Sequence, residues 1–440
     1  MRSRAPVVAI LPAVGLLAAP AWGQCPPQWQ PISSTGPDAS VHALALWDRD
    51  GSGPATPVVA LCGAFSAIGA VPASRVATWD GSTFAPLDAG LNNECRSIAA
   101  MPNGDLYAVG AFTSAGSVAA SRAAVWSGGA WSAMGSGVNS VLLAVVPRTA
   151  TEVVVCGAIT SAGGSPASRI ASWNGSAWSS LGDGLSSTTS ALAVMPNGDV
   201  IAAGAFTSAG GVSANRIARW DGTSWSPLGG GLDVLVRCLL VLPSGDLLAG
   251  GDFTNAGGVQ TKYIARWDGA QWSALGGGLD AATPNPGVYA MARMPGGDVV
   301  AAGNFTVAGG SPVARIARWD GSAWNAMGPG MDVLVRSLLV LPDGRLLAAG
   351  DFTTAGGVAT TRMAIWASPG TCGPTCDSID FNGDSLFPDT QDIDDFLVVF
   401  SGGVCGTGTC GDVDFNNDGL FPDTLDIDAL LSVFSGGPCL

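Results

Sequence analysis

The sequence predicts a mainly β protein, a seven-bladed β-propeller followed by a small α-helical domain. A unit of 47 residues, clearest at 178–224, recurs seven times across residues 29–366. A fixed period of about 40–50 residues, filled with strand-length apolar runs, is typical of propeller repeats. The last 69 residues differ from these repeats, because they contain 13 Asp and no Glu, Lys or Arg. Each repeat ends on a tryptophan, and these are Trp79, Trp126, Trp173, Trp220, Trp267, Trp319 and Trp366.

Four strands are predicted within the unit at 178–224, at 191–196, 199–206, 216–220 and from 224 onward. Pro-Asn-Gly joins the first strand to the second and Asp-Gly joins the third to the fourth, and both favour tight hairpin turns. The other two connections are longer, and they leave the opposite edge of the blade. Binding sites usually lie on long loops held by a rigid scaffold. The face that carries the longer loops is therefore the expected binding face.

The repeat begins in the middle of a blade. A strand of the fourth type surrounds Trp29, and the last copy ends on a third-type strand at Trp366. Pairing of these two strands would complete the seventh blade and remove an open sheet edge. The propeller is accordingly assigned to residues 24–371, with a Cys25–Cys372 disulfide beside the paired strands.

Residues 1–23 have the features of a secretory signal peptide. Arg2 and Arg4 precede a short apolar run, and small residues at positions 21 and 23 suit cleavage before Gln24. The apolar run is too short to span a membrane. The mature protein is expected to be secreted or held at the cell surface, without a membrane span.

Charge and composition exclude several functions. The formal net charge is −15, which argues against nucleic acid as a partner. His42 is the only histidine, so mechanisms and metal sites that need two histidines do not fit. No hydrolase or metalloprotease motif is present, and no catalytic residue is assigned. Four cysteines in the repeats are expected to be free core thiols, and these are Cys62, Cys95, Cys156 and Cys238.

Four residues that depart from the repeat are expected at the mouth of the propeller's central channel. They are Arg96, Arg237, Tyr289 and Arg336. One interpretation is a polar rim that binds a glycan or an anionic group. The other is that the arginines pair with aspartates of the preceding loops and stabilise those loops. The aspartates in question are Asp233, Asp280 and Asp332.

The motifs W-x-x-L-G-x-G, GxFTxAGG and RIARWDG recur through residues 29–366. They resemble kelch-like propeller repeats and related repeat arrays of secreted bacterial proteins. The resemblance implies the architecture, and a propeller scaffold by itself implies no particular activity.

A second repeat, with an offset of 34 residues, occupies 372–440. Each copy opens with Asp-x-Asn-x-Asp and continues into an amphipathic helix pattern. Alternate oxygen ligands before a sharp turn suit calcium, as in the first half of an EF-hand loop. Two calcium sites are predicted, with Asp389 and Asp423 as alternatives to the last ligand of each. The predicted ligands are Asp380, Asn382, Asp384, Leu386 and Asp392 in the first copy and Asp414, Asn416, Asp418, Leu420 and Asp426 in the second.

The cysteine spacing repeats with the same offset, which predicts the bridges Cys376–Cys405 and Cys410–Cys439. The whole module, 372–440, resembles the disulfide-bearing, EF-hand-like dockerin anchors that end many exported proteins of planctomycete-type bacteria. In dockerins, the residues just ahead of each helix carry much of the recognition of the partner. The resemblance therefore implies a cohesin-like or cell-surface partner, contacted by Asp389, Thr390, Asp423 and Thr424.

The sequence as a whole favours an exported, non-enzymatic propeller that binds protein or glycan and is anchored through a calcium-dependent dockerin-like module. The alternative is a polysaccharide-acting hydrolase or lyase on a propeller scaffold, because dockerins often accompany such enzymes. A convergent pair of carboxylates on the long-loop face would distinguish the two.

Overall fold

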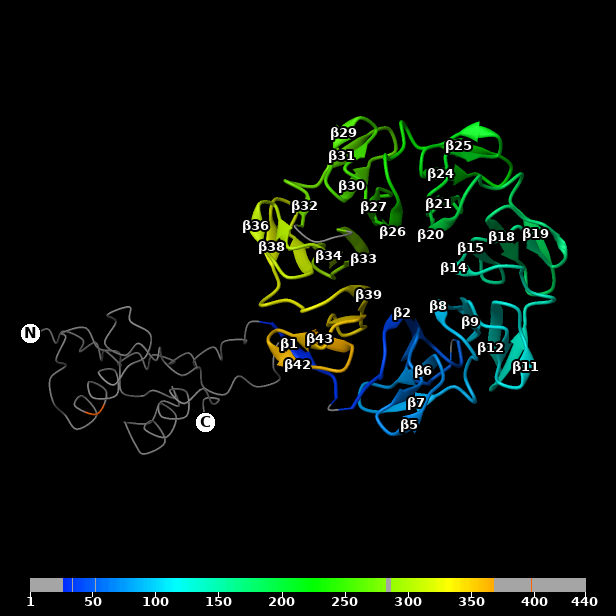
Figure 1. The fold of residues 1–440 in the computed structure, drawn as a ribbon, viewed down its shortest axis with the longest axis horizontal. Helices are drawn as coiled ribbons and strands as arrows, with labels where there is room; N and C mark the ends of the chain where they lie inside the picture. The colour runs from blue at the N-terminus through cyan, green and yellow to red at the C-terminus, as the bar shows by residue number, and fades with distance from the viewer. Residues whose placement is uncertain (1–26, 34, 52, 282–285, 368–396, 398–440) are drawn as a thin grey trace, which may run out of the picture. The chain divides into compact units, whose positions relative to one another are not determined.

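The computed structural model describes residues 27–33, 35–51, 53–281, 286–367 and 397. The chain divides into two units, and the unit Gln28–Ala367 is a closed ring of β-sheets (Figure 1). Several predictions fall outside the described residues. These are the signal peptide, the Cys25–Cys372 disulfide, and the dockerin-like module with its calcium ligands and its two bridges.

Seven antiparallel four-stranded sheets surround a common axis, and they are named blades 1 to 7 in the chain order of their innermost strands (Figure 1). The predicted mainly β propeller is confirmed. The innermost strands are β2 (Val41–Trp47), β8 (Cys95–Ala100), β14 (Leu142–Pro147), β20 (Thr189–Val194), β26 (Val236–Val241), β33 (Gly287–Arg293) and β39 (Val335–Val340). The second strands are β3 (Val58–Gly63), β9 (Leu106–Gly110), β15 (Val153–Gly157), β21 (Val200–Gly204), β27 (Leu247–Gly251), β34 (Val299–Asn304) and β40 (Leu346–Gly350).

The third and outermost strands complete each blade. The third strands are β6 (Val76–Trp79), β12 (Ala123–Ser127), β18 (Ile170–Trp173), β24 (Ile217–Trp220), β30 (Ile264–Trp267), β37 (Ile316–Trp319) and β43 (Met363–Ala367). The outermost strands are β7 (Phe84–Pro86), β13 (Ala130–Ala133), β19 (Trp178–Ser180), β25 (Trp225–Pro227), β31 (Trp272–Ala274), β38 (Trp324–Ala326) and β1 (Gln28–Pro31).

The connection between the second and third strands contains a two-stranded hairpin in every blade. The sequence predicts only a longer loop here, and the structure adds these hairpins to it. Their strands are β4 (Ala67–Ile68) and β5 (Val71–Pro72), β10 (Ser114–Ala115) and β11 (Val118–Ala119), β16 (Ser161–Ala162) and β17 (Ser165–Pro166), β22 (Ser208–Ala209) and β23 (Val212–Ser213), β28 (Asn255–Ala256) and β29 (Val259–Gln260), β35 (Val307–Ala308) and β36 (Ser311–Pro312), and β41 (Thr354–Ala355) and β42 (Val358–Ala359). In blade 6 a further strand, β32 (Leu279–Asp280), pairs with β35.

The ring closes through its first strand. β1 pairs antiparallel with β43, with Trp29 opposite Trp366, and so supplies the outer strand of blade 7. The Trp29 indole also donates a 2.9 Å hydrogen bond to the carbonyl of Met327, which follows blade 6. The hairpin of blade 7 lies against the same side chain, because a Cβ on Gly356 would come within 2.9 Å of the Trp29 Cβ.

The hydrophobic core is divided among the interfaces between adjacent blades. The second strands are buried on both faces; β9, for example, is buried at every residue. In five other interfaces the outer-strand tryptophan repeats the role of Trp29, and its indole donates to the carbonyl that follows the preceding blade. Blade 1 has Phe84 at this position, so its interface with blade 7 lacks that hydrogen bond. The large apolar residue just after the second strand is fully buried in every blade, as expected for core; it is phenylalanine in six blades and isoleucine in blade 3, and the seven residues are Phe65, Phe112, Ile159, Phe206, Phe253, Phe305 and Phe352.

A polar side chain on the linker before six of the seven blades bonds to the hairpin of the next blade. In blade 5, Asp233 accepts hydrogen bonds from the backbone N–H groups of Thr254 and Asn255 at 3.0 and 3.2 Å. Asp332 does the same for Thr353 and Thr354 in blade 7. These bonds satisfy backbone donors that the short hairpin leaves unpaired. The long-loop face is therefore held rigidly by the linkers.

Truncation of Trp29 tests ring closure. We expect Trp29→Ala to lower the free energy of unfolding by about 3–5 kcal/mol, because it removes a buried aromatic side chain that joins two ends of the chain. Trp29→Phe should cost only about 1 kcal/mol, because it removes chiefly one hydrogen bond. Denaturant unfolding of the full chain measures both values. A Trp29→Ala cost no larger than that of Trp29→Phe would contradict the role assigned to β1.

Candidate functional site

Every innermost strand has a β-bulge near its start. The register with the second strand shifts around the second residue of the strand in six blades and around the third residue, Tyr289, in blade 6. Bulges redirect one side chain out of the regular alternation and are common beside functional sites. We name these seven residues the axial rim; they are His42, Arg96, Leu143, Ser190, Arg237, Tyr289 and Arg336.

The axial rim is polar on one side of the ring. The structure places Arg237, Tyr289, Arg336, His42 and Arg96 in the consecutive blades 5, 6, 7, 1 and 2. All five side chains are partly exposed. Blades 3 and 4 carry Leu143 and Ser190 instead. The four residues predicted from sequence at the channel mouth thus occupy equivalent positions, and His42 joins them.

The residue that follows the last glycine of the second strand changes together with the rim. It is alanine in blades 1 to 4, and it is Asp252, Asn304 and Asp351 in blades 5, 6 and 7. Asp252 and Asp351 are the acidic partners of the rim arginines. These two aspartates were not predicted, although the change from Gly-Ala-Phe to Gly-Asp-Phe within the repeat is visible in the sequence.

Two bidentate ion pairs result. Arg237 donates to both carboxylate oxygens of Asp252 at 2.6 and 2.7 Å. Arg336 donates to both oxygens of Asp351 at 2.7 Å. The side chains keep between 22% and 29% of their surface exposed, so both pairs are half-buried at the edge of the site. Such fork-to-fork pairs fix orientation as well as charge.

The pairing of the arginines was predicted with the wrong aspartates. Asp233 and Asp332 bind backbone N–H groups of their own blade's hairpin instead. Asp280 forms an ion pair with Lys262 at 3.4 Å. The physical reason is the bulge, which turns the arginines toward the end of the second strand and away from the linkers.

Tyr289 lies between the two ion pairs in the order of the blades. The Arg237 guanidinium carbon lies 4.4 Å from the centroid of the Tyr289 ring, which is a cation–π contact. Arg237 is therefore held by a carboxylate and by an aromatic face together. The two guanidinium groups, their two carboxylates and the Tyr289 ring therefore form an array of fixed geometry at the rim.

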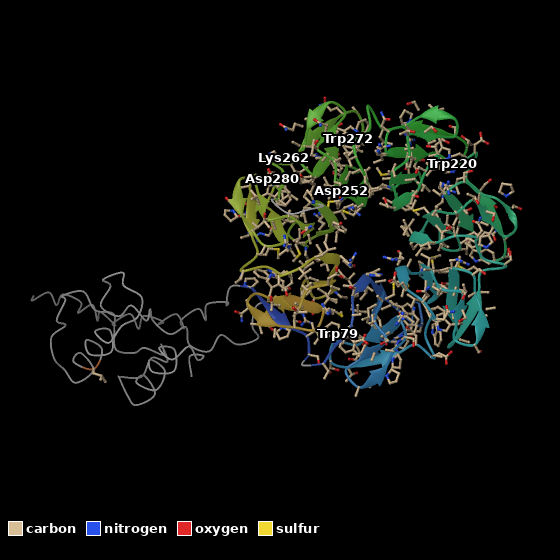
Figure 2. The ribbon with its side chains drawn as sticks, viewed as in Figure 1. Trp79, Trp220, Asp252, Lys262, Trp272 and Asp280 are labelled. Atoms are coloured by element: carbon tan, nitrogen blue, oxygen red, sulfur yellow. The ribbon has the colours of Figure 1, made fainter. Side chains whose placement is uncertain are left out.

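Blade 5 departs further from the repeat close to this array. Six blades carry an arginine with positive φ before the third strand, and blade 5 has Lys262 and Tyr263 there, with φ of 45° and 70°. Four of these arginines donate to backbone carbonyls, and they are Arg75, Arg169, Arg216 and Arg362. Arg75, for example, bonds to the Phe65 carbonyl at 2.9 Å. Asp252 lies nearer the ring axis than Lys262 and Asp280 do (Figure 2). Burial and the charges of Asp280 and Asp252 raise the pKa of Tyr263, so its hydroxyl remains protonated at neutral pH.

His42 and Arg96 complete the polar side. The ring Nδ1 of His42 lies 3.0 Å from the Cys95 carbonyl oxygen, so Nδ1 carries the proton and donates. Burial lowers the pKa of His42, the Cys95 hydrogen bond raises it less, and the charges of Arg96 and Arg336 lower it further. Arg96 forms an ion pair with Glu94. The imidazole is consequently neutral at pH 7.

The Asp351 carboxylate is an ionised acceptor. Burial raises the pKa of Asp351, but hydrogen bonds from Arg336 and Ser40 and the charge of Arg336 outweigh burial, and the pKa lies below its usual value. A carboxylate held in this state cannot act as a general acid at neutral pH. The array is suited to binding and orienting a ligand.

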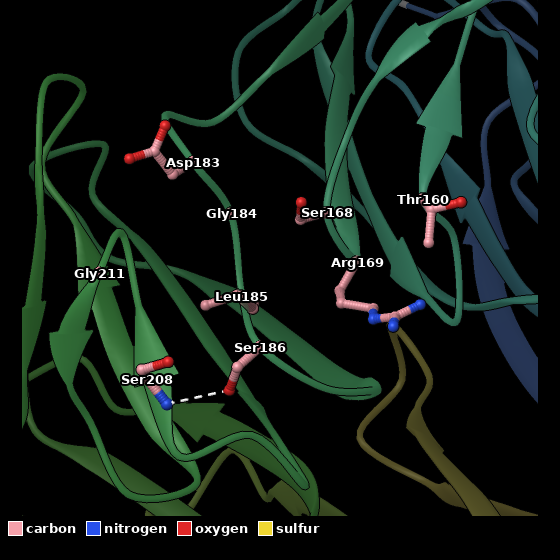
Figure 3. Close-up of a pocket in the computed structure, with 9 residues that line it drawn as sticks. All are labelled: Thr160, Ser168, Arg169, Asp183, Gly184, Leu185, Ser186, Ser208 and Gly211. Carbon is pink, nitrogen blue, oxygen red and sulfur yellow. Dashed lines mark hydrogen bonds between the residues drawn. The ribbon is translucent and has the colours of Figure 1, made fainter.

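Two hollows lie away from the rim. One of about 300 Å³, between blades 3 and 4 on the long-loop face, is lined by Arg169, Asp183 and Ser186 (Figure 3). Ser186 accepts a 3.1 Å hydrogen bond from the Ser208 N–H, and Arg169 donates to the carbonyl of Ala158, so both are used structurally. The other, of about 460 Å³, lies between blades 5 and 6 on the short-turn face and includes Arg266 and Asp298.

In the structure, the four repeat cysteines are present as thiols, in line with the expectation from sequence. No group of three or more metal-ligating side chains occurs among the residues that the structure describes. In the same ranges, no helix has the length and apolar character needed to cross a bilayer.

Comparison with known proteins identifies the class. A family described as a domain of unknown function (DUF5122) with a β-propeller fold matches residues 196–220, 242–267 and 341–364. These segments cover the second and third strands of blades 4 and 5, and in blade 7 the second strand and the start of the third. The chain is a β-propeller protein. No curated protein matches its sequence.

Solved structures share the fold at low identity. The extracellular domain of BT4673 from B. thetaiotaomicron, described as a one-component system, is 9% identical with a TM-score of 0.51, covering 82% of this chain and 42% of that one. A second structure of it, described as a hybrid two-component system, is 10% identical with a TM-score of 0.50, covering 77% and 40%. The WD40 propeller of Doa1 is 13% identical with a TM-score of 0.50, covering 79% and 98%. This chain therefore spans about two fifths of the length of the first two.

The neutral state of His42 makes stability depend on pH. Its pKa is lowered in the folded protein from the ordinary value of 6.5. As pH falls below about 6.5, the unfolded chain binds a proton before the folded one, so the free energy of unfolding falls by at most about 1.4 kcal/mol per pH unit. We expect His42→Gln, which can still donate to Cys95, to remove this component. Denaturant unfolding between pH 7.5 and 5.5 measures it, and the same pH dependence in both proteins would contradict the assignment.

Proposed function

We propose that this protein is an exported, non-enzymatic binding protein whose propeller recognises a glycan at the polar side of its axial rim. The observation that carries the proposal is the break in the repeat. Seven blades share one packing pattern, and the rim alone combines Arg–Asp pairs, a tyrosine ring and a neutral histidine on consecutive blades. Packing does not require these residues, because blades 3 and 4 form the same bulge with Leu143 and Ser190.

The charge state favours a hydroxyl-rich ligand over a bare anion. Arg237 and Arg336 are already neutralised by bidentate carboxylates. The remaining N–H groups and carboxylate lone pairs can bind hydroxyls, which donate and accept at once. The Tyr289 ring adds an apolar face of the kind that packs against a sugar. Convergent polar groups beside aromatic surface are typical of small-ligand sites.

The alternative, a polysaccharide hydrolase or lyase, has less support. Glycoside hydrolysis usually needs one carboxylic acid with a raised pKa. The pKa of Asp351 is lowered instead, and Asp252 is held in a bidentate ion pair. A turnover assay on any polysaccharide that binds would test this enzymatic alternative.

The anchor belongs to the same proposal. The loops at Asp380–Asp384 and Asp414–Asp418 would each hold a calcium ion, and calcium would neutralise the aspartates that otherwise repel each other. The ordered module would then bind a cohesin-like or cell-surface partner. Two kinds of support point outside the cytoplasm. The sequence has signal-peptide features, and the first two structural neighbours are extracellular domains.

Glycan binding is tested on the full chain. A glycan array identifies the ligand, and titration calorimetry with that glycan compares the wild type with Tyr289→Ala and Arg336→Ala. We expect each variant to weaken binding at least tenfold, because each removes a contact at a preorganised rim. The matched control is Leu143→Ala, a substitution at the same bulge position of blade 3, which should leave the affinity unchanged.

The outcomes separate the possibilities. No bound glycan on the array, or equal losses in Tyr289→Ala and Leu143→Ala, contradicts the rim as a glycan site. Release of reducing sugar from the bound polysaccharide would favour the enzymatic alternative.

Calcium dependence tests the anchor. Chelation of the full chain should lower the melting temperature of one transition and leave the propeller transition in place, because the predicted ligands all lie in 372–440. Calcium titration should fall from two sites to one in Asp380→Ala, whereas Asp377→Ala, outside the loop, should keep both. A single melting transition that chelator does not move would contradict the anchor.

A further inference from the structure

Cys62 and Cys95 meet at the interface between blades 1 and 2. Cys62 lies in β3 and Cys95 is the first residue of β8, and both side chains are fully buried in one hydrophobic cluster. The backbone confirms how near they are. Ala43 is the register partner of Cys62, and the ring of the preceding residue, His42, bonds to the Cys95 carbonyl at 3.0 Å.

The repeat supplies the geometry of this contact. The equivalent residues between blades 5 and 6 are Gly250 and Val288, which hold the same register positions. A Cβ placed on Gly250 would lie 3.0 Å from the Val288 Cβ. The two positions therefore face each other directly across a blade interface. Because a disulfide joins Cβ atoms about 3.5–4.5 Å apart, this interface has the spacing for one with slight opening.

The other blade interfaces fill the same two positions with side chains that cannot cross-link. Cys62 and Cys95 are the one pair of cysteines among them. The remaining pairs are Val109 with Leu142, Cys156 with Thr189, Ala203 with Val236, Ala302 with Val335, and Ala349 with Val41.

We propose that Cys62 and Cys95 form a disulfide that joins blades 1 and 2 in the mature protein. The two thiols lose two protons and two electrons, and an external disulfide, carried by a thiol–disulfide oxidoreductase or a small disulfide, is reduced to two thiols. One cysteine first forms a mixed disulfide with the oxidant, and the other then displaces it. The inference rests on export to an oxidising compartment, where such bonds persist.

The bond must form before the two blades close. Both side chains are fully buried in the ring, so an oxidant cannot reach them afterwards. Burial, followed by the neighbouring Cys95 thiol, also raises the pKa of Cys62 and leaves little thiolate in the folded state. Once formed, the bond lies directly beneath the rim, because Arg96 follows Cys95 in β8 and the Cys95 carbonyl holds His42.

The chain contains its own controls. Cys156 is equally buried, and its facing residue is Thr189. The Cys238 sulfur lies 3.6 Å from the Val288 carbonyl oxygen. Neither shares its described cluster with a second cysteine.

Peptide mapping tests the proposal on the full chain, produced with its signal sequence and exported. The protein is denatured in excess alkylating agent and digested without reduction. We expect one linked peptide pair containing Cys62 and Cys95, with Cys156 and Cys238 alkylated. Alkylation of Cys62 and Cys95 to the same extent as the controls, or a link from either to another cysteine, overturns the proposal.

A variant separates the bond from the fold. Cys62→Ala combined with Cys95→Val reproduces the natural Ala302–Val335 interface, so the ring should assemble. Reductant should lower the melting temperature of the propeller transition by several degrees in the wild type and in Cys156→Ala, and by clearly less in the double variant. Equal shifts in all three proteins would assign the effect to other disulfides and contradict the proposal. Glycan binding does not enter either readout.

Discussion

The pairing of β1 with β43 is the constraint on which the rest of the ring depends. Each interface between blades buries one hydrophobic cluster, and six of these interfaces connect blades that are neighbours along the chain. The seventh connects blade 7 to blade 1 across the whole repeat. Without β1, blade 7 would end on β43 with a row of unpaired backbone groups. The strand satisfies those groups, and its tryptophan also bonds back to the residue after blade 6, so one short segment completes blade 7 and fixes its interface with blade 6.

Because seven blades repeat one packing solution, each position in a blade has six comparisons inside the same molecule. Positions that packing determines hardly vary, as the fully buried large apolar residue just after the second strand illustrates. The bulged position of the innermost strand varies from Leu143 to Arg336 while its backbone stays the same. Variation under a constant backbone means that the side chain is free to serve something other than the fold. The polar rim on consecutive blades is identified by this contrast, and it does not depend on a remote likeness to another propeller.

Much of this architecture could be predicted from the sequence, for identifiable reasons. The 47-residue period, the Asp-Gly turns and the position of Trp29 determine the blades, their phase and the closing strand. The hairpin between the second and third strands could not be predicted, because its strands are two residues long and carry no alternation. The bulge was equally hidden, since it is a property of backbone register. The bulge determines which aspartate Arg336 reaches. Because the bulge was not predicted, Arg336 was expected to pair with Asp332, whereas in the structure it pairs with Asp351.

The polar side of the axial rim, the proposed ligand site, extends across the interface between blades 7 and 1, where the ring closes. This interface lacks the indole hydrogen bond, because Phe84 stands where other blades carry tryptophan. Near the ring axis, two other hydrogen bonds cross this interface. Ser40 of the linker into blade 1 hydrogen-bonds to the Asp351 carboxylate, and the Ser337 hydroxyl accepts from the Leu44 N–H at 3.2 Å. The same Asp351 orients Arg336 in the rim.

Asp351, which orients the rim residue Arg336, thus bonds across the one described blade interface that lacks the indole hydrogen bond. A ligand bound by Arg336 and Tyr289 would add contacts to groups that already join the two ends of the ring. Any ligand that binds only the closed ring shifts the folding equilibrium toward it. Because the polar side of the axial rim spans the closing interface, a ligand bound there would also increase the stability of the closed ring.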